Sequence, residues 1–383
     1  MKKNNQRMNY YIIAGEASGD LHAANLIREL RLNDTSANIR AWGGDRMAQE
    51  GAVMVKHYKD LAFMGFVEVL MNLRSIFHNL DFCKKDILAF QPDVIILVDY
   101  PGFNLRIAEW AHQQSIRVFY YISPQIWAWK QSRVKHIRRT VERMFVILPF
   151  EKSFYQRFGV EVDFVGHPLL DAIEAEISEH PFNAGKFISR NKLTNKPLIA
   201  LLPGSREQEI AKMLEQMLSV IYDYPEHQFV IAGVNSIPEA FYQSIIGTKP
   251  VKLVFGQTHE LLRSSEVALV TSGTATLETA LLNVPEVVCY KGGYLSYLIA
   301  RQLIKVKYIS LVNLIMDREV VKELIQNQLN SKNLKYELDR ILNMPEEKQQ
   351  ILSDYAELRH VLGDKGASKK TAQLIHKYLY PVQ

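Results

Sequence analysis

The apolar positions of the chain alternate between short β-rich runs and longer stretches with helical periodicity. Val94–Val98 is apolar throughout, and a strand that is apolar on both faces is typical of a parallel sheet covered by helices on each side. Strands are expected on this basis at Tyr10–Ala14, Val94–Val98, Arg117–Ile122, Leu198–Leu202, Gln228–Ala232, Lys252–Phe255, Val267–Thr271 and Val287–Tyr290. The helices expected among them include Asp20–Arg31, Asn104–Gln113, Arg206–Val220 and Thr274–Leu282.

This strand–helix series occurs twice, which predicts an α/β protein with two doubly wound, Rossmann-like domains facing a cleft. We expect the first domain at residues 1–172, a polar linker at 173–197 and the second domain at 198–345. The C-terminal helices, at 346–383, are expected to pack back on the chain or across a dimer. Ligands of doubly wound sheets bind beyond the carboxyl ends of the strands, so the loops after strands are the candidates for chemistry.

Composition narrows the class of protein. The chain has 383 residues, of which 48% are hydrophobic and 23% are charged, and these globular averages exclude a disordered, fibrous or polytopic membrane protein. Two cysteines, Cys83 and Cys289, imply no disulfide framework and favour a reducing cytoplasm. The net charge of +5 is weak evidence for nucleic acid, and we expect no nucleic-acid partner.

Acidic residues mark the loops of the first half. Gly15–Asp20 follows the first strand but lacks the glycines of a dinucleotide fingerprint, and its two acids disfavour phosphate, so we expect it to accept hydrogen bonds from hydroxyl groups. The alternative interpretation of this loop is a tight turn in which Asp20 caps the next helix. Asp99 ends the strand Val94–Val98, where it is placed to accept a proton from a hydroxyl nucleophile or only to fix the turn.

A third loop, Ser123–Lys130, carries Trp127 and Trp129. Alternate Trp side chains suit stacking on a sugar ring or lining an apolar acyl channel. A run of cations with a single acid, Glu142, among them follows: Lys130, Arg133, Lys135, Arg138, Arg139 and Arg143. The run indicates either a site for an anionic ligand or a solvated basic helix.

The loops of the second half favour anions. Ser205 and Gln208 form an S-x-x-Q capping box that places Arg206 in the first turn of a helix, where a bound diphosphate would make the cation favourable. Thr271–Glu278 opens another helix, with Ser272 and Thr274 near a phosphate. Glu278 is then placed to accept hydrogen bonds from a ribose diol. No D-x-D, H-x-x-x-H or H-E-x-x-H motif occurs, so we expect no metal and no cofactor.

Leu61–Leu73 is apolar almost all round, broken only by Glu68 and Asn72. It predicts either a buried core helix or an interfacial helix entering lipid headgroups. The membrane-facing candidates are Phe63, Met64, Phe66, Val67 and Leu70.

Together these motifs resemble the lipid-A-disaccharide synthase family over nearly the whole chain. The segments that carry the resemblance, in the order seen in that family, are GEASGD (15–20), DYPGFN (99–104), SPQIWAWK (123–130), FVGHPLLD (164–171), LLPGSR (201–206) and SGTATLE (272–278). GEASGD and SPQIWAWK are specific to the family, whereas SGT-x-x-LE is shared by glycosyltransferases of the GT-B fold.

The resemblance implies an inverting glycosyltransferase of lipid A and lipopolysaccharide biosynthesis. Such an enzyme joins UDP-2,3-diacylglucosamine to 2,3-diacylglucosamine 1-phosphate (lipid X), giving the β-1,6-linked lipid A disaccharide 1-phosphate and UDP. The family is peripheral on the cytoplasmic face of the inner membrane, acts without a metal and forms dimers through its C-terminal part. The resemblance thus implies a lipid surface as partner and a possible homodimer.

Site residues carry over by position. The donor contacts implied are Arg206, Phe255, Gly256, Gln257, Ser272, Gly273, Thr274, Glu278 and Asn313. The acceptor contacts implied are Ser18, Ser123, Gln125, Trp127, Trp129 and Lys130. Asp99, Glu16 and Arg206 are the catalytic candidates. Many members carry Asp-x-Pro-Asp-Phe-Asn in the second loop, and here Gly102 replaces the second acid, so the base is expected to be Asp99 or Glu16.

Two alternatives stay open. A UDP-N-acetylglucosamine 2-epimerase has the same architecture and a similar nucleotide half, but needs neither a lipid-facing segment nor a double-Trp loop. Outside catalysis, the same features fit a nucleotide-sugar-binding scaffold at the membrane.

Overall fold

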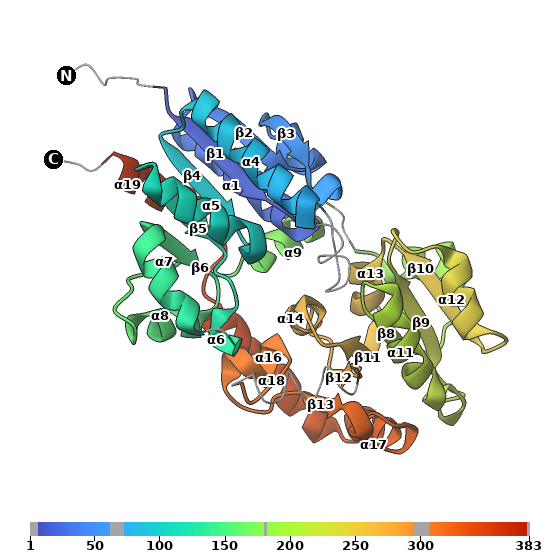
Figure 1. Cartoon of the computed structure of the whole chain (residues 1–383). Helices are drawn as coiled ribbons and strands as arrows, with labels where there is room; N and C mark the ends of the chain where they lie inside the picture. The colour runs from blue at the N-terminus through green and yellow to red at the C-terminus, as the bar shows by residue number, and fades with distance from the viewer. Residues whose placement is uncertain (1–6, 62–72, 130, 180–181, 294–305, 381–383) are drawn as a thin grey trace. The chain divides into compact units, whose positions relative to one another are not determined.

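The structure is a computed structural model that describes residues 7–61, 73–129, 131–179, 182–293 and 306–380 (Figure 1). The chain divides into two compact units. Unit 1 comprises Met1–Asp171 with Leu362–Gln383, and unit 2 comprises Ala172–Val361. Each unit is built on one parallel sheet with helices, which confirms the predicted α/β class with two doubly wound domains.

Unit 1 holds a sheet of strand order β3-β2-β1-β4-β5-β6-β7. Its strands are β1 (Asn9–Ala14), β2 (Asn38–Gly43), β3 (Val53–His57), β4 (Val94–Val98), β5 (Val118–Tyr121), β6 (Arg143–Val146) and β7 (Asp163–Phe164). Its helices are α1 (Ala17–Asn33), α2 (Asp45–Gln49), α4 (Leu73–Phe90), α5 (Pro101–Gln113), α6 (Ile126–Trp129), α7 (Val134–Thr140), α8 (Pro149–Gln156) and α19 (Ala367–Leu379), while α9 (Pro168–Glu179) runs across the boundary into unit 2.

Alternate residues of the central strand β1 build two cores in unit 1, because successive side chains of a strand point to opposite faces. Ile12 packs in a cluster with Ile27 of α1 and Ile375 of α19. On the other face, the Tyr11 hydroxyl donates to Asp86 of α4 at 2.6 Å and accepts from Trp42 Nε1 at 2.8 Å. The sheet is therefore covered on both faces, as the wholly apolar strand β4 predicts.

Unit 2 holds a sheet of strand order β10-β9-β8-β11-β12-β13. Its strands are β8 (Leu198–Leu202), β9 (Gln228–Gly233), β10 (Val251–Phe255), β11 (Ser265–Thr271), β12 (Glu286–Tyr290) and β13 (Lys322–Ile325). Its helices are α10 (Ala184–Arg190), α11 (Glu207–Met217), α12 (Glu239–Ile246), α13 (Thr258–Arg263), α14 (Thr274–Leu281), α16 (Leu311–Met316), α17 (Ser331–Asn343) and α18 (Pro345–Val361). Short 3-10 helices occur at Tyr58–Leu61, Gln131–Arg133, Leu218–Asp223 and Gln326–Gln328.

In both units the order of strands reverses beside the first strand of the sheet. In unit 1 this happens between β1 and β4, and in unit 2 between β8 and β11. The loops after these strands diverge there, which opens a crevice where doubly wound proteins bind ligands. The motifs at Gly15–Asp20, Asp99–Asn104, Leu201–Arg206 and Thr271–Glu278 all lie at these two places.

The predicted strands occur within one or two residues of their expected bounds. The sequence pattern missed β2, β3, β6, β7 and β13, which are partly polar or short and are fixed by pairing with a neighbouring strand. Arg143 belongs to β6, so the predicted basic helix ends earlier, at Thr140.

The expected boundaries differ from the observed ones at two places. Residues 173–197, expected as a polar linker, belong to unit 2 and contain most of α9 and all of α10. Helix α10 packs on the core of unit 2 through the buried Phe187. The expected C-terminal segment is divided, because α18 belongs to unit 2 and α19 packs on α1 of unit 1. Within the described residues, no helix combines the length and apolar character needed to cross a membrane.

Candidate functional site

Asp99 stands at the carboxyl end of β4 in a strained backbone. Asp99 and Tyr100 both have positive φ angles, 46° and 49°. Such residues cost about 1–3 kcal/mol each and persist only where the surroundings fix them. The fixing groups are the Asn104 side-chain amide, which donates to the Asp99 carbonyl at 2.7 Å, and the Tyr120 hydroxyl, which donates to the same oxygen at 2.6 Å. These two bonds fix the backbone that carries the Asp99 side chain.

The Gly15–Asp20 loop packs against this turn. A Cβ at Gly15 would lie 2.2 Å from the Tyr100 ring, so only glycine allows this approach. Glu16 is exposed at the N-cap of α1, close enough for its charge to act on Asp99. Burial, and secondarily the Glu16 charge, raise the pKa of Asp99 to about 6. The two predicted carboxylates are therefore brought together, and Asp99 has the character of a general base near neutral pH.

The other two polar residues of the first loop differ in their surroundings. Ser18 is exposed in the first turn of α1. Asp20 is buried inside α1, and its carboxylate accepts from the backbone N–H groups of Gly44, Arg46 and Met47 at 2.7–3.2 Å. Asp20 therefore caps α2, 24 residues or more along the chain, and not the helix that directly follows its own loop.

The predicted acceptor loop after β5 is partly interior. Ser123 is buried, with its hydroxyl 2.8 Å from that of Tyr155, and Trp127 is buried with its indole N–H donating to Glu151 at 3.2 Å. Glu151 also accepts from the backbone of Leu148 at 3.0 Å, and burial raises its pKa to about 7. The polar groups of Ser123 and Trp127 are thus engaged inside unit 1, which differs from the expected contact with a ligand.

The remaining members of this loop face outward. Gln125 is exposed, and the Trp129 side chain is 48% exposed with the Arg133 guanidinium 5.9 Å from its ring centre. Lys130 lies outside the described residues, as do the membrane candidates Phe63, Met64, Phe66, Val67 and Leu70. Of the predicted acceptor set, Ser18, Gln125 and Trp129 are exposed.

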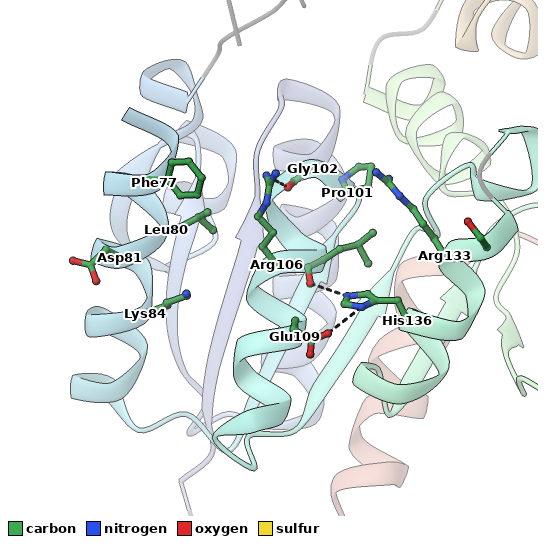
Figure 2. Close-up of a pocket in the computed structure, with 12 residues that line it drawn as sticks. Phe77, Leu80, Asp81, Lys84, Pro101, Gly102, Arg106, Glu109, Arg133 and His136 are labelled. Atoms are coloured by element: carbon green, nitrogen blue, oxygen red, sulfur yellow. Dashed lines mark hydrogen bonds and ion pairs between the residues drawn. The ribbon is translucent and has the colours of Figure 1, made fainter. Parts of the chain in front are cut away.

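A cavity of about 860 Å³ in unit 1 lies between α4, α5 and the α7 region (Figure 2). Figure 2 shows Phe77, Leu80 and Lys84 of α4 turned toward α5, whereas Asp81 turns away from it. The lining residues are Phe77, Leu80, Asp81, Lys84, Pro101, Gly102, Leu105, Arg106, Glu109, Ser132, Arg133 and His136. Its wall includes the start of α5, so it adjoins the turn that holds Asp99.

A second cavity, of about 380 Å³, lies at the reversal point of the unit 2 sheet. Its turns contain Gly204 and Gly273, whose positive φ angles of 115° and 152° favour glycine. The lining residues are Leu202, Gly204, Ser205, Arg206, Glu209, Ala232, Gly233, Val234, Thr258, Thr271, Ser272, Gly273, Thr274, Ala275 and Glu278. The predicted residues Arg206, Ser272, Gly273, Thr274 and Glu278 are therefore brought together around one space.

The Arg206 loop is built differently from its sequence prediction. Helix α11 begins at Glu207 with Arg206 as N-cap residue, and the Ser205–Gln208 capping box does not form. Glu209 replaces it, because its carboxylate accepts from the Ser205 N–H at 2.9 Å. Among the described residues Arg206 is exposed and has no ion-pair partner, so its charge is available to an anion.

Glu278 is held by a histidine that the sequence analysis missed. His259 Nε2 lies 2.6 Å from a carboxylate oxygen of Glu278 and is hydrogen-bonded to it. His259 Nδ1 lies 2.6 Å from Glu176, but this contact is an ion pair without a well-aligned hydrogen bond. Burial alone lowers the pKa of His259, but its contacts with the two carboxylates outweigh burial and raise it. Only tertiary structure joins these three residues, since they come from α9, α13 and α14.

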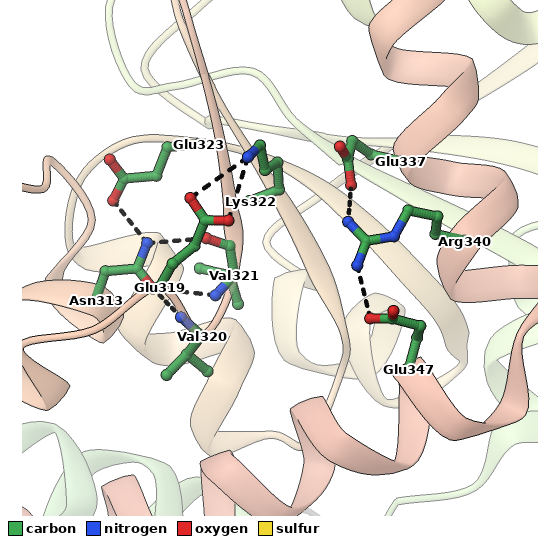
Figure 3. Close-up of polar contacts among 9 residues, drawn as sticks. All are labelled: Asn313, Glu319, Val320, Val321, Lys322, Glu323, Glu337, Arg340 and Glu347. Atoms are coloured by element: carbon green, nitrogen blue, oxygen red, sulfur yellow. Dashed lines mark hydrogen bonds and ion pairs between the residues drawn. The ribbon is translucent and has the colours of Figure 1, made fainter.

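Asn313 is wholly buried and does not line the cavity. Figure 3 shows its amide bonded on both sides: the nitrogen donates to Val321 and Glu323, and the oxygen accepts from the N–H groups of Val320 and Val321. Glu323 in turn accepts from the Ile309 N–H at 3.0 Å, and the Ile309 carbonyl accepts from the Ser272 hydroxyl at 2.9 Å. Asn313 therefore supports the Ser272 turn from behind, in place of the expected direct donor contact.

Phe255, Gly256 and Gln257, which the resemblance implies as donor contacts, also stay outside the lining of this cavity. Phe255 packs edge-on against Tyr242, and the side-chain oxygen Oε1 of Gln257 accepts from the side chains of Arg190 and Asn191. Within the described parts of the chain, no three His, Cys, Asp or Glu side chains lie together as a candidate metal site.

Solved structures share this fold. The UDP-N-acetylglucosamine 2-epimerase from Neisseria meningitidis, bound to UDP-GlcNAc, superposes with a TM-score of 0.66 at 15% identity over 97% of this chain and 99% of that one. A putative enzyme of the same name from Listeria monocytogenes gives 0.69 at 12% identity, with 99% and 98% covered. At this identity the likeness concerns the fold alone.

Comparison with sequence relatives identifies the family. A family model described as lipid-A-disaccharide synthetase matches residues 10–378. The lipid-A-disaccharide synthase of Syntrophus aciditrophicus is 40% identical over 368 residues, with 94% of this chain and 95% of the relative covered. That of Trichlorobacter lovleyi is 36% identical over 370 residues, with 95% and 96% covered. The motifs, the fold and these relatives agree, and the chain belongs to the lipid-A-disaccharide synthase family.

Proposed function

We propose that the protein transfers 2,3-diacylglucosamine from its UDP derivative to the 6-hydroxyl of 2,3-diacylglucosamine 1-phosphate with inversion. The products are the β-1,6-linked disaccharide 1-phosphate and UDP. The observation that carries the proposal is the pair of sites at the two reversal points. Unit 1 has a carboxylate with a pKa of about 6, and unit 2 has a cavity of about 380 Å³ with a cation, Arg206, that forms no ion pair with any described residue.

On the acceptor side, Asp99 takes the proton of the 6-hydroxyl while the oxygen of that hydroxyl forms a bond to the anomeric carbon of the donor. A pKa of about 6 leaves Asp99 mainly ionised at neutral pH, yet basic enough for the transfer. Glu16 keeps that pKa raised by its negative charge. Glu16 is the second candidate for the base, because it is exposed beside Asp99.

On the donor side, the bond from the anomeric carbon to UDP breaks, and negative charge develops on the diphosphate. Arg206 and the free N–H groups at the start of α14 supply positive potential for that charge. Glu278 is placed to accept hydrogen bonds from the ribose. The cavity is within the about 300–1,000 Å³ typical of ligand pockets.

The acyl chains of both substrates imply work at a lipid surface, and we propose peripheral attachment to the cytoplasmic face of the inner membrane. Exposed Phe77, Phe82 and Leu88 on α4 support this, because they continue the apolar segment 61–73 along the chain. Replacing Phe63, Met64 and Phe66 with Ser is expected to reduce co-flotation with vesicles. The homodimer stays a prediction, which analytical ultracentrifugation tests.

The deciding experiment measures UDP release with both lipid substrates and with each alone. We expect release only with both, together with a disaccharide of β configuration by NMR. UDP binding without release in the complete mixture would favour the scaffold alternative. Conversion of UDP-N-acetylglucosamine alone into its manno isomer would favour the epimerase.

A further inference from the structure

The 860 Å³ cavity between α4, α5 and α7 carries a positive charge that its own residues do not neutralise. Lys84, Arg106 and Arg133 line it, and among the described residues none of them forms an ion pair. Lys84 lies 5.9 Å from the ring centre of Trp110, and Arg133 lies at the same distance from Trp129. Arg106 donates to the carbonyl of Gly102 at 2.8 Å.

The acids of the cavity have other partners. Asp81 forms an ion pair with Lys85 at 2.8 Å, and Glu109 forms pairs with Arg139 and His136. Asp81 also turns away from α5 in Figure 2. Two lining carboxylates are thus engaged with cations, whereas three lining cations remain without a carboxylate, so the cavity favours an anion.

The same cavity has an apolar side. Phe77 is 61% exposed on α4, and Leu80, Pro101 and Leu105 continue the surface toward the start of α5. An exposed aromatic ring beside a cationic wall matches a ligand with a hydrocarbon part next to an anionic group. Inorganic phosphate alone has no group to cover Phe77.

The location relates the cavity to the reaction. Pro101 and Gly102 form part of its wall, and α5 begins at Pro101, two residues after Asp99. A molecule whose hydroxyl reaches Asp99 is therefore within reach of the cavity with its other substituents. The donor phosphates are already accounted for by the unit 2 cavity.

We propose that this cavity binds the phosphate of the acceptor together with the hydrocarbon of an adjoining acyl chain. Lys84, Arg106 and Arg133 hold the phosphate, and Phe77, Leu80 and Leu105 contact the chain. The assignment rests on the proposed function, since it supposes that the acceptor is an acylated sugar phosphate. It adds a phosphate-selecting site to a reaction whose base and leaving-group contacts lie elsewhere.

Arg106 offers a matched test, because its side chain is exposed and lines the cavity. Arg106→Glu replaces the cation by a carboxylate, whereas Arg106→Gln removes the charge and keeps a polar side chain. We expect Arg106→Glu to raise the acceptor KM about tenfold with the donor KM unchanged, because the new charge repels the phosphate. Arg106→Gln should raise the acceptor KM less.

Two further measurements show whether the change in acceptor KM comes from the phosphate of the acceptor. With an acceptor analogue that lacks the phosphate, the Glu and Gln variants of Arg106 should behave alike. Equal losses with both acceptors would overturn the proposal. So would a loss of Arg106→Glu binding to phosphatidylglycerol vesicles with an unchanged acceptor KM, because the cavity would then serve a membrane headgroup.

A second variant guards against a local folding effect. Arg106 is exposed, and Arg106→Gln should raise the KM of the phosphorylated acceptor severalfold while Arg74→Gln, on an exposed position of α4 outside the cavity lining, should not. If wild-type protein releases no UDP at all, the proposed function fails, and direct binding of the phosphorylated and dephosphorylated acceptors in detergent still tests the cavity. Equal affinity for the two would refute it.

Discussion

The two reversal points of the sheets occupy the same place in the fold and have opposite electrostatic character. In unit 1 the turn after β4 places a half-buried acid in left-handed backbone beside a second acid. In unit 2 the turns after β8 and β11 place glycines in left-handed backbone, an unpaired arginine and the start of a helix. One loop raises the pKa of a carboxylate, and the other leaves positive potential exposed.

The difference teaches that topology determines where a ligand binds, while the side chains of a few loop residues determine which chemistry takes place. In unit 1, Asn104 and Tyr120 donate to the carbonyl of Asp99 and fix the strained turn, and burial then raises the pKa of its carboxyl group. In unit 2, Glu209 satisfies the Ser205 N–H, which leaves Arg206 unpaired among the described residues. Each prediction below changes one side of this contrast.

The largest effect is expected from Asp99→Asn, which removes the proposed base and keeps a residue that tolerates left-handed backbone. We expect kcat to fall by about 10²–10⁴-fold, with UDP affinity unchanged. Wild-type kcat/KM should rise with pH through about 6, the pKa of Asp99. Glu16→Gln serves as the comparison: if it removes activity and Asp99→Asn does not, Glu16 is the base.

The same variant predicts a change in stability with a definite sign. Because the pKa of Asp99 is raised on folding, the folded protein disfavours its ionised form, and stability falls as pH rises from about 4 to about 6. Asp99→Asn should therefore be more stable at pH 7, by up to about 3 kcal/mol, and lose this advantage below pH 4. Urea unfolding at the two pH values measures it, and a less stable variant at pH 7 would contradict the burial argument.

On the other side of the contrast, Arg206→Ala should lower kcat by about 10²–10³-fold and raise the donor KM, because the cation acts most strongly on departing UDP. Arg206→Lys should recover part of kcat, since it keeps the charge and loses the guanidinium geometry. Steady-state kinetics and UDP titration distinguish the effects. Wild-type kinetics in Arg206→Ala would remove the diphosphate role.

A smaller effect is expected from His259→Gln, which leaves Glu278 and Glu176 without the imidazole between them. We expect the donor KM to rise about three- to tenfold with kcat little changed, because His259 positions Glu278 and does not touch the reacting atoms. Wild-type donor affinity should weaken as pH rises through the raised pKa of His259, and the variant should lose this dependence. An identical pH profile in both proteins would exclude the positioning role.

The last expected effect concerns local stability. Burial lowers the pKa of His22 to about 4 and, with the neighbouring His22, that of His167 to about 3, so unit 1 loses stability as pH falls below about 6.5. His259 has the opposite shift, so its contribution to unit 2 is retained at low pH. Hydrogen exchange at pH 6.5 and 4.5 should show greater loss of protection, corrected for intrinsic rates, in α1 than in α14. Equal losses would argue against buried neutral histidines.

By itself, the sequence determined the central strands, the α/β class and the Ser272–Glu278 turn, because apolar runs and glycine- and hydroxyl-rich loops are local signals. Tertiary structure decided what no local pattern holds: Asp20 caps α2, Trp127 is engaged by Glu151, Asn313 is buried behind Ser272, and His259 joins Glu278 to Glu176. The physical reason is that hydrogen-bonding capacity is a property of a residue, whereas the partner that uses it is brought by segments distant in the chain.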